Sequence, residues 1–240
     1  GLRSISVLVD ITNFITLDRG RPLHVFDADR ISGDLEVRSS RAGESILALD
    51  DQRYILDNET TVIADSSGPL SLGGVIGGQA SGCSSSTRNV FVEAALFDAA
   101  LTAVTGRRYG IESDARYRFE RGVDPDAVIV GMEAASQMII SLCGGEASEL
   151  VTAGAPPDWR RIVSLRTERI QELVGIKISS EATRSILERL GFSANKNGKT
   201  LDVSIPSWRK DIDGEADLVE EIARIHGYEK IPLVSLGSSN

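Results

Sequence analysis

The alternation of apolar and polar positions predicts that the first part of the chain is rich in strands. Short β-branched runs between clusters of turn residues are typical of strands. Longer stretches with helical spacing follow them, and this order of strands and then helices indicates an α+β domain with a mixed β-sheet. We predict strands at Ser6–Asp10, Glu36–Arg38, Ser45–Leu49, Arg53–Leu56, Thr60–Ala64 and Val90–Ala94, a hairpin tip at Asp50-Asp51-Gln52, and helices at Asp98–Tyr109 and Ala127–Cys143.

The rest of the chain has a different order of predicted helices and strands. We predict helices at Thr167–Val174, Ser180–Leu190 with Ser180 as its cap, and Glu215–Ile225, and strands at Phe192–Ala194 and Leu201–Ile205 around an Asn197-Gly198 turn. Two helices followed by a hairpin are the order of a small winged-helix-like α/β unit, in which the hairpin would be the wing.

The two patterns predict two domains. Residues 151–161 contain Gly154, Pro156 and Pro157 and are the natural linker. We therefore predict an α+β domain over 1–150, a linker over 151–161, a winged-helix-like domain over 162–232 and a tail over 233–240.

The charge agrees with this division. The chain of 240 residues has a formal net charge of -9, and residues 1–150 hold 13 Arg, no Lys and 22 acidic residues. The bases and acids of residues 151–240 balance, so all the net charge belongs to the first domain. Nucleic-acid affinity comes largely from Lys and Arg that neutralise phosphates, so this composition argues against a free-standing electrostatic binder.

Other classes are also excluded. No apolar run approaches the roughly 18 to 20 residues that a membrane helix needs, and the start of the chain lacks the pattern of a secretory signal. We therefore expect a soluble, cytoplasmic protein that makes no membrane contact. Cys83 and Cys143 are too few for a disulfide framework or a zinc site, so we expect reduced thiols.

Several segments carry unusual polar residues. They are VLVDITNF, RPLHVFDADRI, GGVIGG, VEAALF, SDARYRFERGVDP and PSWRKDIDGEADLVEEIARIHGYEKIP. Taken alone, each segment is weak evidence for a function. The paired glycines, for example, lack the Lys and Ser/Thr of a phosphate-binding loop and are typical of a tight β-turn. Together, in this order and spacing, they resemble the β subunit of bacterial phenylalanyl-tRNA synthetase.

The resemblance implies that residues 1–150 correspond to the B3/B4 editing module and residues 162–232 to the B5 module. It also implies that the chain is an internal fragment, without the first strand or so of its B3/B4 module and without the tRNA-binding and catalytic-like domains of the whole subunit. Its partners would be the α subunit, in an α2β2 heterotetramer, and the acceptor end of tRNA(Phe). The ATP and phenylalanine sites for ligation would lie on the α subunit.

The family's editing site hydrolyses Tyr-tRNA(Phe) made in error. Glu93 matches the residue that reads the tyrosine hydroxyl, and His24, Thr12 and Asn13 match further catalytic positions. Gly78, Ser113 and Ala115 match substrate-binding positions, where small side chains leave room for the amino-acid ring. From the residues alone, the structural explanation is favoured for both: Glu93 as a strand carboxylate and His24 as a structural histidine. A binding or scaffold module with a degenerate pocket is therefore the alternative function.

A second candidate site is acidic. Asp217, Glu220 and Glu221 have the spacing that places them on one face of a helix, and Asp211 precedes it. Carboxylates are the hard oxygen donors that Mg²⁺ prefers, and the resemblance implies that these four hold a Mg²⁺ shared with the α subunit. Acids in the first turns of a helix also complement its dipole without any metal, so that explanation stays open.

Overall fold

The computed structural model describes residues 4–233, so 234–240 of the predicted tail lie outside the described residues. Contacts between residues divide the chain into two compact units, Gly1–Pro156 and Pro157–Asn240. Both contain helices and antiparallel strands, which confirms the α+β class. Within residues 4–233, no helix is long and apolar enough to cross a membrane.

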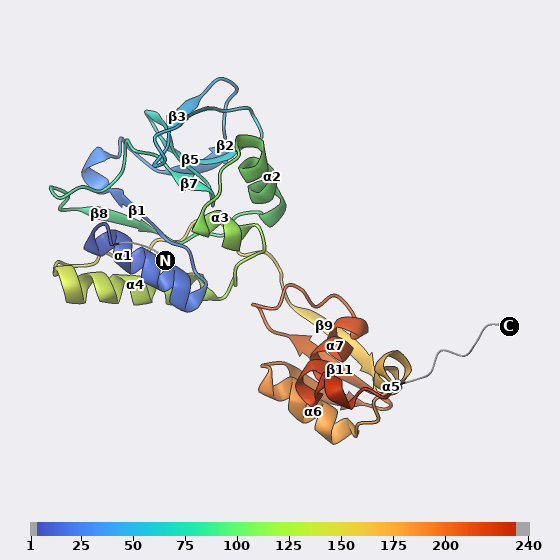
Figure 1. Ribbon diagram of the computed structural model, residues 1–240. Coiled ribbons are helices and arrows are strands. Elements are labelled where there is room, and N and C mark those ends of the chain that lie inside the picture. Colours follow the sequence, from blue (N-terminus) through green and yellow to red (C-terminus); the bar gives the residue numbers. More distant parts are fainter. Residues whose placement is uncertain (1–3, 234–240) are drawn as a thin grey trace. The chain divides into compact units, whose positions relative to one another are not determined.

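The strands of the first unit form three small sheets (Figure 1). The largest has the order β2-β5-β6-β7, and the others pair β1 with β8 and β3 with β4, all antiparallel. The strands are β1 His24–Asp27, β2 Glu36–Ser39, β3 Ser45–Leu47, β4 Arg53–Ile55, β5 Thr61–Asp65, β6 Gly68–Leu72, β7 Ile76–Gly77 and β8 Val90–Glu93. The glycine-rich segment is the tight turn between β6 and β7, as the sequence indicated.

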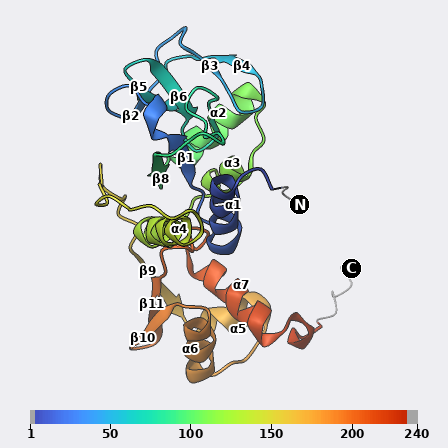
Figure 2. The ribbon, with the colours of Figure 1, turned by 90° about the vertical axis from the view of Figure 1, so that its left-hand side faces the viewer.

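Two helices lie side by side below the sheets (Figures 1 and 2). They are α1 (Val7–Arg19) and α4 (Ala127–Cys143), and their contact buries Ile11, Ile15 and Ala135. Two shorter helices, α2 (Ala99–Tyr109) and α3 (Asp114–Phe119), and the 3-10 turn η1 (Ala28–Arg30) complete the unit.

The predicted strand at Ser6–Asp10 is wrong, because these residues begin helix α1. The Ser6 side chain accepts a hydrogen bond from the backbone N–H of Val9, so it caps the helix. Ile11 and Ile15 lie one helical turn apart and are both buried against α4. The packing of this face outweighs the local strand preference of the β-branched residues before it.

The second unit packs three helices around a three-stranded sheet of order β10-β11-β9. Its elements are β9 Arg161–Arg166, α5 Glu168–Val174, α6 Ser180–Arg189, β10 Ser193–Asn197, β11 Thr200–Ile205, α7 Glu215–His226 and the 3-10 turn η2 Tyr228–Lys230. The helix, helix, hairpin order is confirmed, whereas the role of the hairpin as a wing stays a prediction. The sequence analysis missed β9, and the cap of α6 is Ser179 rather than Ser180.

Candidate functional site

His24 and Glu93 lie directly opposite each other in the antiparallel pair of β1 and β8. Directly opposed residues of an antiparallel pair project from the same face, so these two side chains share one surface of the two-stranded sheet. They are 69 positions apart in the sequence, and strand pairing alone makes them neighbours.

The imidazole of His24 is enclosed by apolar and small groups. Its ring stands edge-on to Phe26 with ring centres 4.4 Å apart, and a Cβ at Gly77 would collide with it. Its Nε2 atom is buried and has no hydrogen-bond partner among the described residues. Burial lowers the pKa of His24 to about 4, so the ring is neutral at pH 7.

The carboxyl group of Glu93 is held in an equally unfavourable place for a charge. Burial raises the pKa of Glu93 to about 7, and the positive charge of Arg21 opposes that rise. Near neutral pH both forms of the carboxyl are therefore populated. A small change in the surrounding charge is enough to select one of them.

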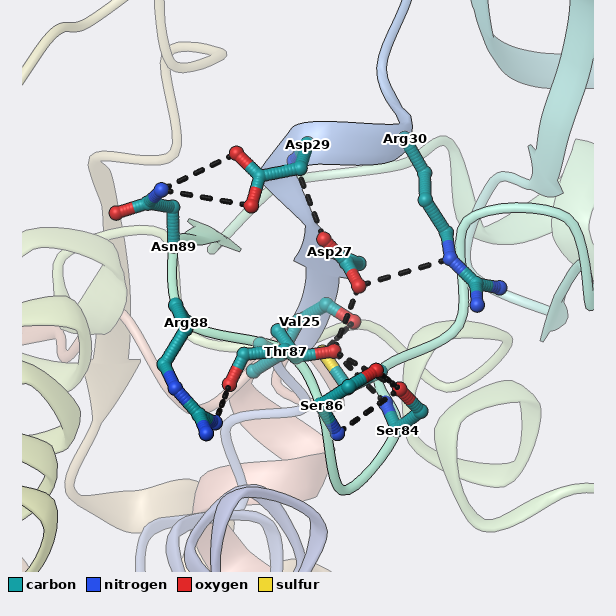
Figure 3. A network of polar contacts seen from close by, with 10 residues as sticks. Val25, Asp27, Asp29, Arg30, Ser84, Ser86, Thr87, Arg88 and Asn89 are labelled. Atoms are coloured by element: carbon teal, nitrogen blue, oxygen red, sulfur yellow. Dashed lines mark hydrogen bonds and ion pairs between the residues drawn. The ribbon is translucent and has the colours of Figure 1, made fainter.

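A polar network holds the other end of the same strand pair (Figure 3). The buried Asp27 carboxylate accepts hydrogen bonds from the Thr87 hydroxyl at 2.6 Å and from the Asp29 backbone N–H at 3.1 Å, and it lies 3.6 Å from the Arg30 Nε. Asn89 donates to the Asp29 carboxylate. Thr87 and Asn89 belong to the loop that leads into β8, so this network holds the register that places Glu93 opposite His24.

Thr12 and Asn13 lie on α1. The Thr12 hydroxyl donates to the backbone carbonyl of Val9 in the same helix at 2.8 Å, and Asn13 is half-buried. Over residues 4–233, no hydrogen bond or ion pair joins either of them to His24 or Glu93.

The three predicted substrate-binding residues lie on other elements. Gly78 follows β7 and lines a hollow of about 460 Å³ together with Ile46 and Leu70. Ser113 caps α3 by accepting from the Arg116 backbone N–H, and its own hydroxyl donates to the Val75 carbonyl at 2.6 Å. Ala115, on α3, is half-buried.

One hairpin links these positions to His24. Val75, which accepts from Ser113, and Gly77, which lies against the His24 ring, both belong to the turn and strand around β7. The structure thus brings His24 and Glu93 together and connects Gly78 and Ser113 to them through the hairpin, but neither hollow that contains Gly78 or Ser113 is lined by His24 or Glu93.

The four acidic residues of the second unit are all engaged by other groups of the protein. Asp217 accepts from the backbone N–H groups of Asp213 and Gly214, both at 2.9 Å, and so caps α7. Glu220 is exposed and accepts from the Tyr228 hydroxyl at 2.8 Å. The capping contact of Asp217 agrees with the role of acids at a helix start, whereas Glu220 lies in the middle of the helix.

The other two acidic residues bind the same arginine. Arg209 pairs with Asp211 at 2.6 Å and with the buried Glu221 at 3.0 Å, and Arg224 also pairs with Glu221. The hydrogen bond from Arg209 lowers the pKa of Asp211. Burial raises the pKa of Glu221, but the hydrogen bonds from Arg209 and Arg224 outweigh it, and the net pKa is lowered. In the described part of the chain, no three His, Cys, Asp or Glu side chains come together to hold a metal ion.

Comparison with known proteins finds a matching domain family for each of the two units. A family described as "B3/4 domain" matches residues 1–144, and one described as "tRNA synthetase B5 domain" matches residues 163–228. Over 238 residues the chain is 52% identical to the phenylalanine–tRNA ligase beta subunit of Rhodospirillum rubrum. The chain belongs to the phenylalanyl-tRNA synthetase β-subunit family.

The B3/4 and B5 domains form part of longer relatives. The match to the Rhodospirillum rubrum protein covers 98% of this chain and 30% of that protein. A phenylalanine–tRNA ligase beta subunit of Brucella abortus is 49% identical over 243 residues, and the match covers 100% of this chain and 30% of that protein. The crystal structure of an N-terminal fragment of the phenylalanyl-tRNA synthetase beta subunit from Pyrococcus horikoshii is 16% identical, with a TM-score of 0.44, and the match covers 92% of this chain and 65% of that one. The chain thus spans about 30% of the length of the curated relatives that it matches.

Sequence analysis missed one charged residue of the B3/4 domain. Arg21 precedes β1 by three positions and is 1% exposed, yet it stands between a glycine and a proline in a stretch that reads as a turn. Arginine is almost never fully buried without a partner, so no pattern in the sequence signals its position.

Proposed function

We propose that the first unit is a hydrolytic editing site for Tyr-tRNA(Phe), within the β chain of a phenylalanine–tRNA ligase that supports aminoacylation. The observation that carries the proposal is the pairing of Glu93 with a neutral His24 across one strand pair. Family membership supports it, because the residues matched by the B3/4 family include both.

Glu93 supplies the selectivity in this proposal. A carboxylate accepts a hydrogen bond from the tyrosine hydroxyl, whereas phenylalanine would leave it buried and unpaired. A site built around such a bond strongly rejects phenylalanine, which lacks the hydroxyl. An apolar pocket rejects tyrosine, which carries the hydroxyl, much less strongly.

His24 and the substrate would position the attacking water. A neutral imidazole with a pKa of about 4 is a weak base at pH 7, so we assign it the role of holding water or the terminal ribose rather than removing a proton. Its Nε2 is free for such a bond among the described residues. Thr12 and Asn13 stay proposed contributors. A covalent route through Cys83 is disfavoured, because burial raises the pKa of its thiol.

The test uses the assembled synthetase with Glu93→Ala or His24→Ala and measures hydrolysis of Tyr-tRNA(Phe). We expect Glu93→Ala to be about tenfold or more slower, the size of one lost hydrogen bond to a charged group, and His24→Ala to be several-fold slower, the size of one lost hydrogen bond between neutral groups. Ligation of phenylalanine is the control and is expected to be unchanged. Hydrolysis at the parental rate in both variants would refute the editing assignment.

A scaffold role for the B3/4 domain is the second candidate. The observation that favours it is that Ser113 has both a donor and an acceptor role inside the protein, in capping α3 and bonding Val75. The same deacylation experiment decides between the two, since a scaffold predicts hydrolysis that does not depend on Glu93.

We further propose the α subunit, in an α2β2 heterotetramer, and the acceptor end of tRNA(Phe) as partners, and the cytoplasm as the compartment. The charge supports dependence on partners: an acidic, Lys-free domain has little electrostatic attraction for RNA by itself. The chain alone is therefore expected to bind tRNA(Phe) weakly at physiological salt in a filter-binding assay. Tight binding would contradict that expectation.

A Mg²⁺ at Asp211, Asp217, Glu220 and Glu221 stays a prediction for the assembled enzyme. As described, the four carboxylates do not fit one ion, since Glu221 would have to leave Arg209 and Arg224. Calorimetry of the assembled synthetase is expected to show weaker Mg²⁺ binding with Asp217→Asn and with Glu221→Gln than with the parent. Equal affinities would leave only the capping and ion-pair roles of these residues.

A further inference from the structure

The Nε2 atom of His24 is closed off from solvent. It is buried and has no hydrogen-bond partner among residues 4–233. A buried nitrogen that makes no hydrogen bond is costly, because water can no longer satisfy it. The proposed editing reaction needs the opposite, since a water or a ribose hydroxyl has to bond to this atom. One of the groups around the ring must therefore move before His24 can act.

Phe26, Gly77 and Leu49 lie around the ring and differ in how freely they can move. Phe26 is fully buried, with its ring centre 4.4 Å from that of His24, so it is held by the core. Gly77 presents only backbone, and a Cβ there would lie 3.0 Å from the His24 Nε2. The Leu49 Cδ1 lies 3.0 Å from the same point. Leu49 and His24 are therefore neighbours above the glycine backbone.

Leu49 combines a fixed backbone with a side chain that is free to turn. Its backbone N–H donates to the Gly77 carbonyl at 3.0 Å, and the Gln79 N–H donates to the Leu47 carbonyl at 2.9 Å. These bonds hold the hairpin of β3 and β4 against β7. The Leu49 side chain, by contrast, is 54% exposed. Exposed side chains change rotamer within picoseconds to nanoseconds, so it can leave the ring without any backbone movement.

We propose that Leu49 is the gate residue of the editing site, whose side chain covers the Nε2 of His24 and turns aside when tyrosyl-tRNA enters. Gly77 makes this cover possible, because a larger residue there would occupy the space that His24 and Leu49 share. Leu49 acts only through His24, so it is a positioning residue and not a catalytic one. The inference rests on the proposed function for its consequence, but not for the cover itself.

Acylation by diethyl pyrocarbonate tests the cover directly, because the chain has only two histidines. Mass spectrometry of peptides gives the rate at His24 and, as an internal reference, at the half-buried His226 of the second unit. The reaction is run at about pH 8, where an imidazole of ordinary pKa is also neutral. If the cover is open in about a tenth of the parent molecules, Leu49→Ala reacts about tenfold faster at His24, with no change at His226.

Two further variants locate the cover on the hairpin. Leu47→Ala removes the same side chain at a position that is 38% exposed and lines the hollow beside Gly78, which His24 does not line. It is the matched control and is expected to leave both rates unchanged. Leu49→Met keeps a side chain of similar volume and is expected to react like the parent. Parental reactivity of His24 in a folded Leu49→Ala variant would overturn the proposal.

A second measurement does not depend on the Leu49→Ala variant. In the chain with ¹³C-labelled leucine methyls, we expect a nuclear Overhauser effect between a Leu49 methyl and the Hε1 of His24, because both groups lie beside the same point at Gly77. Leu49→Met identifies the methyl signal by removing it. Absence of this effect in the parent would also overturn the cover.

The consequence is read in the assembled synthetase from the hydrolysis of Tyr-tRNA(Phe). A closed cover reduces the apparent affinity by the fraction of molecules that are open, so Leu49→Ala is expected to lower KM by up to about tenfold with kcat near the parent. Ligation of phenylalanine is the control and is expected to be unchanged. A parental KM in Leu49→Ala, together with slow hydrolysis by His24→Ala, would refute the gate and leave the editing site standing. Parental hydrolysis by His24→Ala would refute the editing role of His24 while leaving its cover by Leu49 intact.

Discussion

Gly78→Ala is expected to destabilise the first unit by about 3 kcal/mol, the upper part of the range for overpacking a core. A Cβ at this position would lie 2.6 Å from the backbone carbonyl oxygen of Leu70 and 3.0 Å from the Ile46 Cδ1. The same Leu70 oxygen accepts the Gly78 backbone N–H at 2.7 Å, so the two chain segments cannot separate without breaking that bond. A backbone atom cannot move aside as the end of a flexible side chain can.

Urea denaturation followed by far-UV circular dichroism measures this loss. Trp159 and Trp208, the two tryptophans of the chain, both lie in the second unit, so their fluorescence reports that unit separately and is expected to be unchanged. Gly214→Ala is the matched control, because a Cβ there meets nothing within 4 Å. Parental stability of Gly78→Ala would show that its small size serves a pocket, as the resemblance implies, rather than the packing.

Glu93→Gln is expected to make the first unit lose stability on acidification more steeply than the parent does. In the parent, burial raises the pKa of Glu93 from 4.5 to about 7, so the folded state holds a proton that the unfolded chain releases. This group therefore lowers stability as the pH rises from about 4.5 to about 7.

His24 has the opposite effect. Burial lowers its pKa from 6.5 to about 4, so the unfolded chain binds the proton first, and stability is lost as the pH falls from about 6.5 to about 4. In the parent, the two groups therefore change the free energy of unfolding in opposite directions between about pH 4.5 and pH 6.5. In Glu93→Gln only the dependence on pH due to His24 remains, and in His24→Gln only the one due to Glu93.

Free energies of unfolding measured at pH 4.5 and pH 6.5 test the expected effects of Glu93→Gln and His24→Gln. Between these values, we expect Glu93→Gln to gain on the order of 1–2 kcal/mol more than the parent as the pH rises, and His24→Gln to change in the opposite direction. The magnitude is below the full shift because both residues keep part of their surface exposed to solvent, which screens their titrating groups. Parallel pH profiles for all three proteins would contradict the burial of these two groups.

Local patterns predicted most of the elements correctly. The Asn197-Gly198 turn lies between paired strands β10 and β11, and Gly144 ends α4, because such residues act through their own backbone conformation. Ser6–Asp10 was wrongly predicted as a strand because its β-branched residues have strand propensity, and only the contact of α1 with α4 overrides it.

The candidate site was predicted less completely. The residues Glu93 and His24 could be selected by their resemblance to the family, but their opposition across β1 and β8 depends on strand register. Asp217 and Glu221 have the spacing of one helix face, yet Asp217 caps the helix and Glu221 is buried against Arg209. Spacing along a helix predicts which face a side chain lies on. It does not predict which positively charged residue of another segment will pair with that side chain.

The sequence by itself determined the family, the α+β class, the two-part charge pattern and most helices and turns, because each of these depends on residue identity or on neighbours within a few positions. Only the tertiary structure decided that Arg21 is buried without a hydrogen-bond partner among the described residues, that Gly78 lies against Leu70, and that Asp211 and Glu221 of the B5 domain share Arg209. These features depend on the burial and pairing of residues far apart in the chain. The electrostatics of the site follow from that burial, since the same carboxyl or imidazole in water would keep its ordinary pKa.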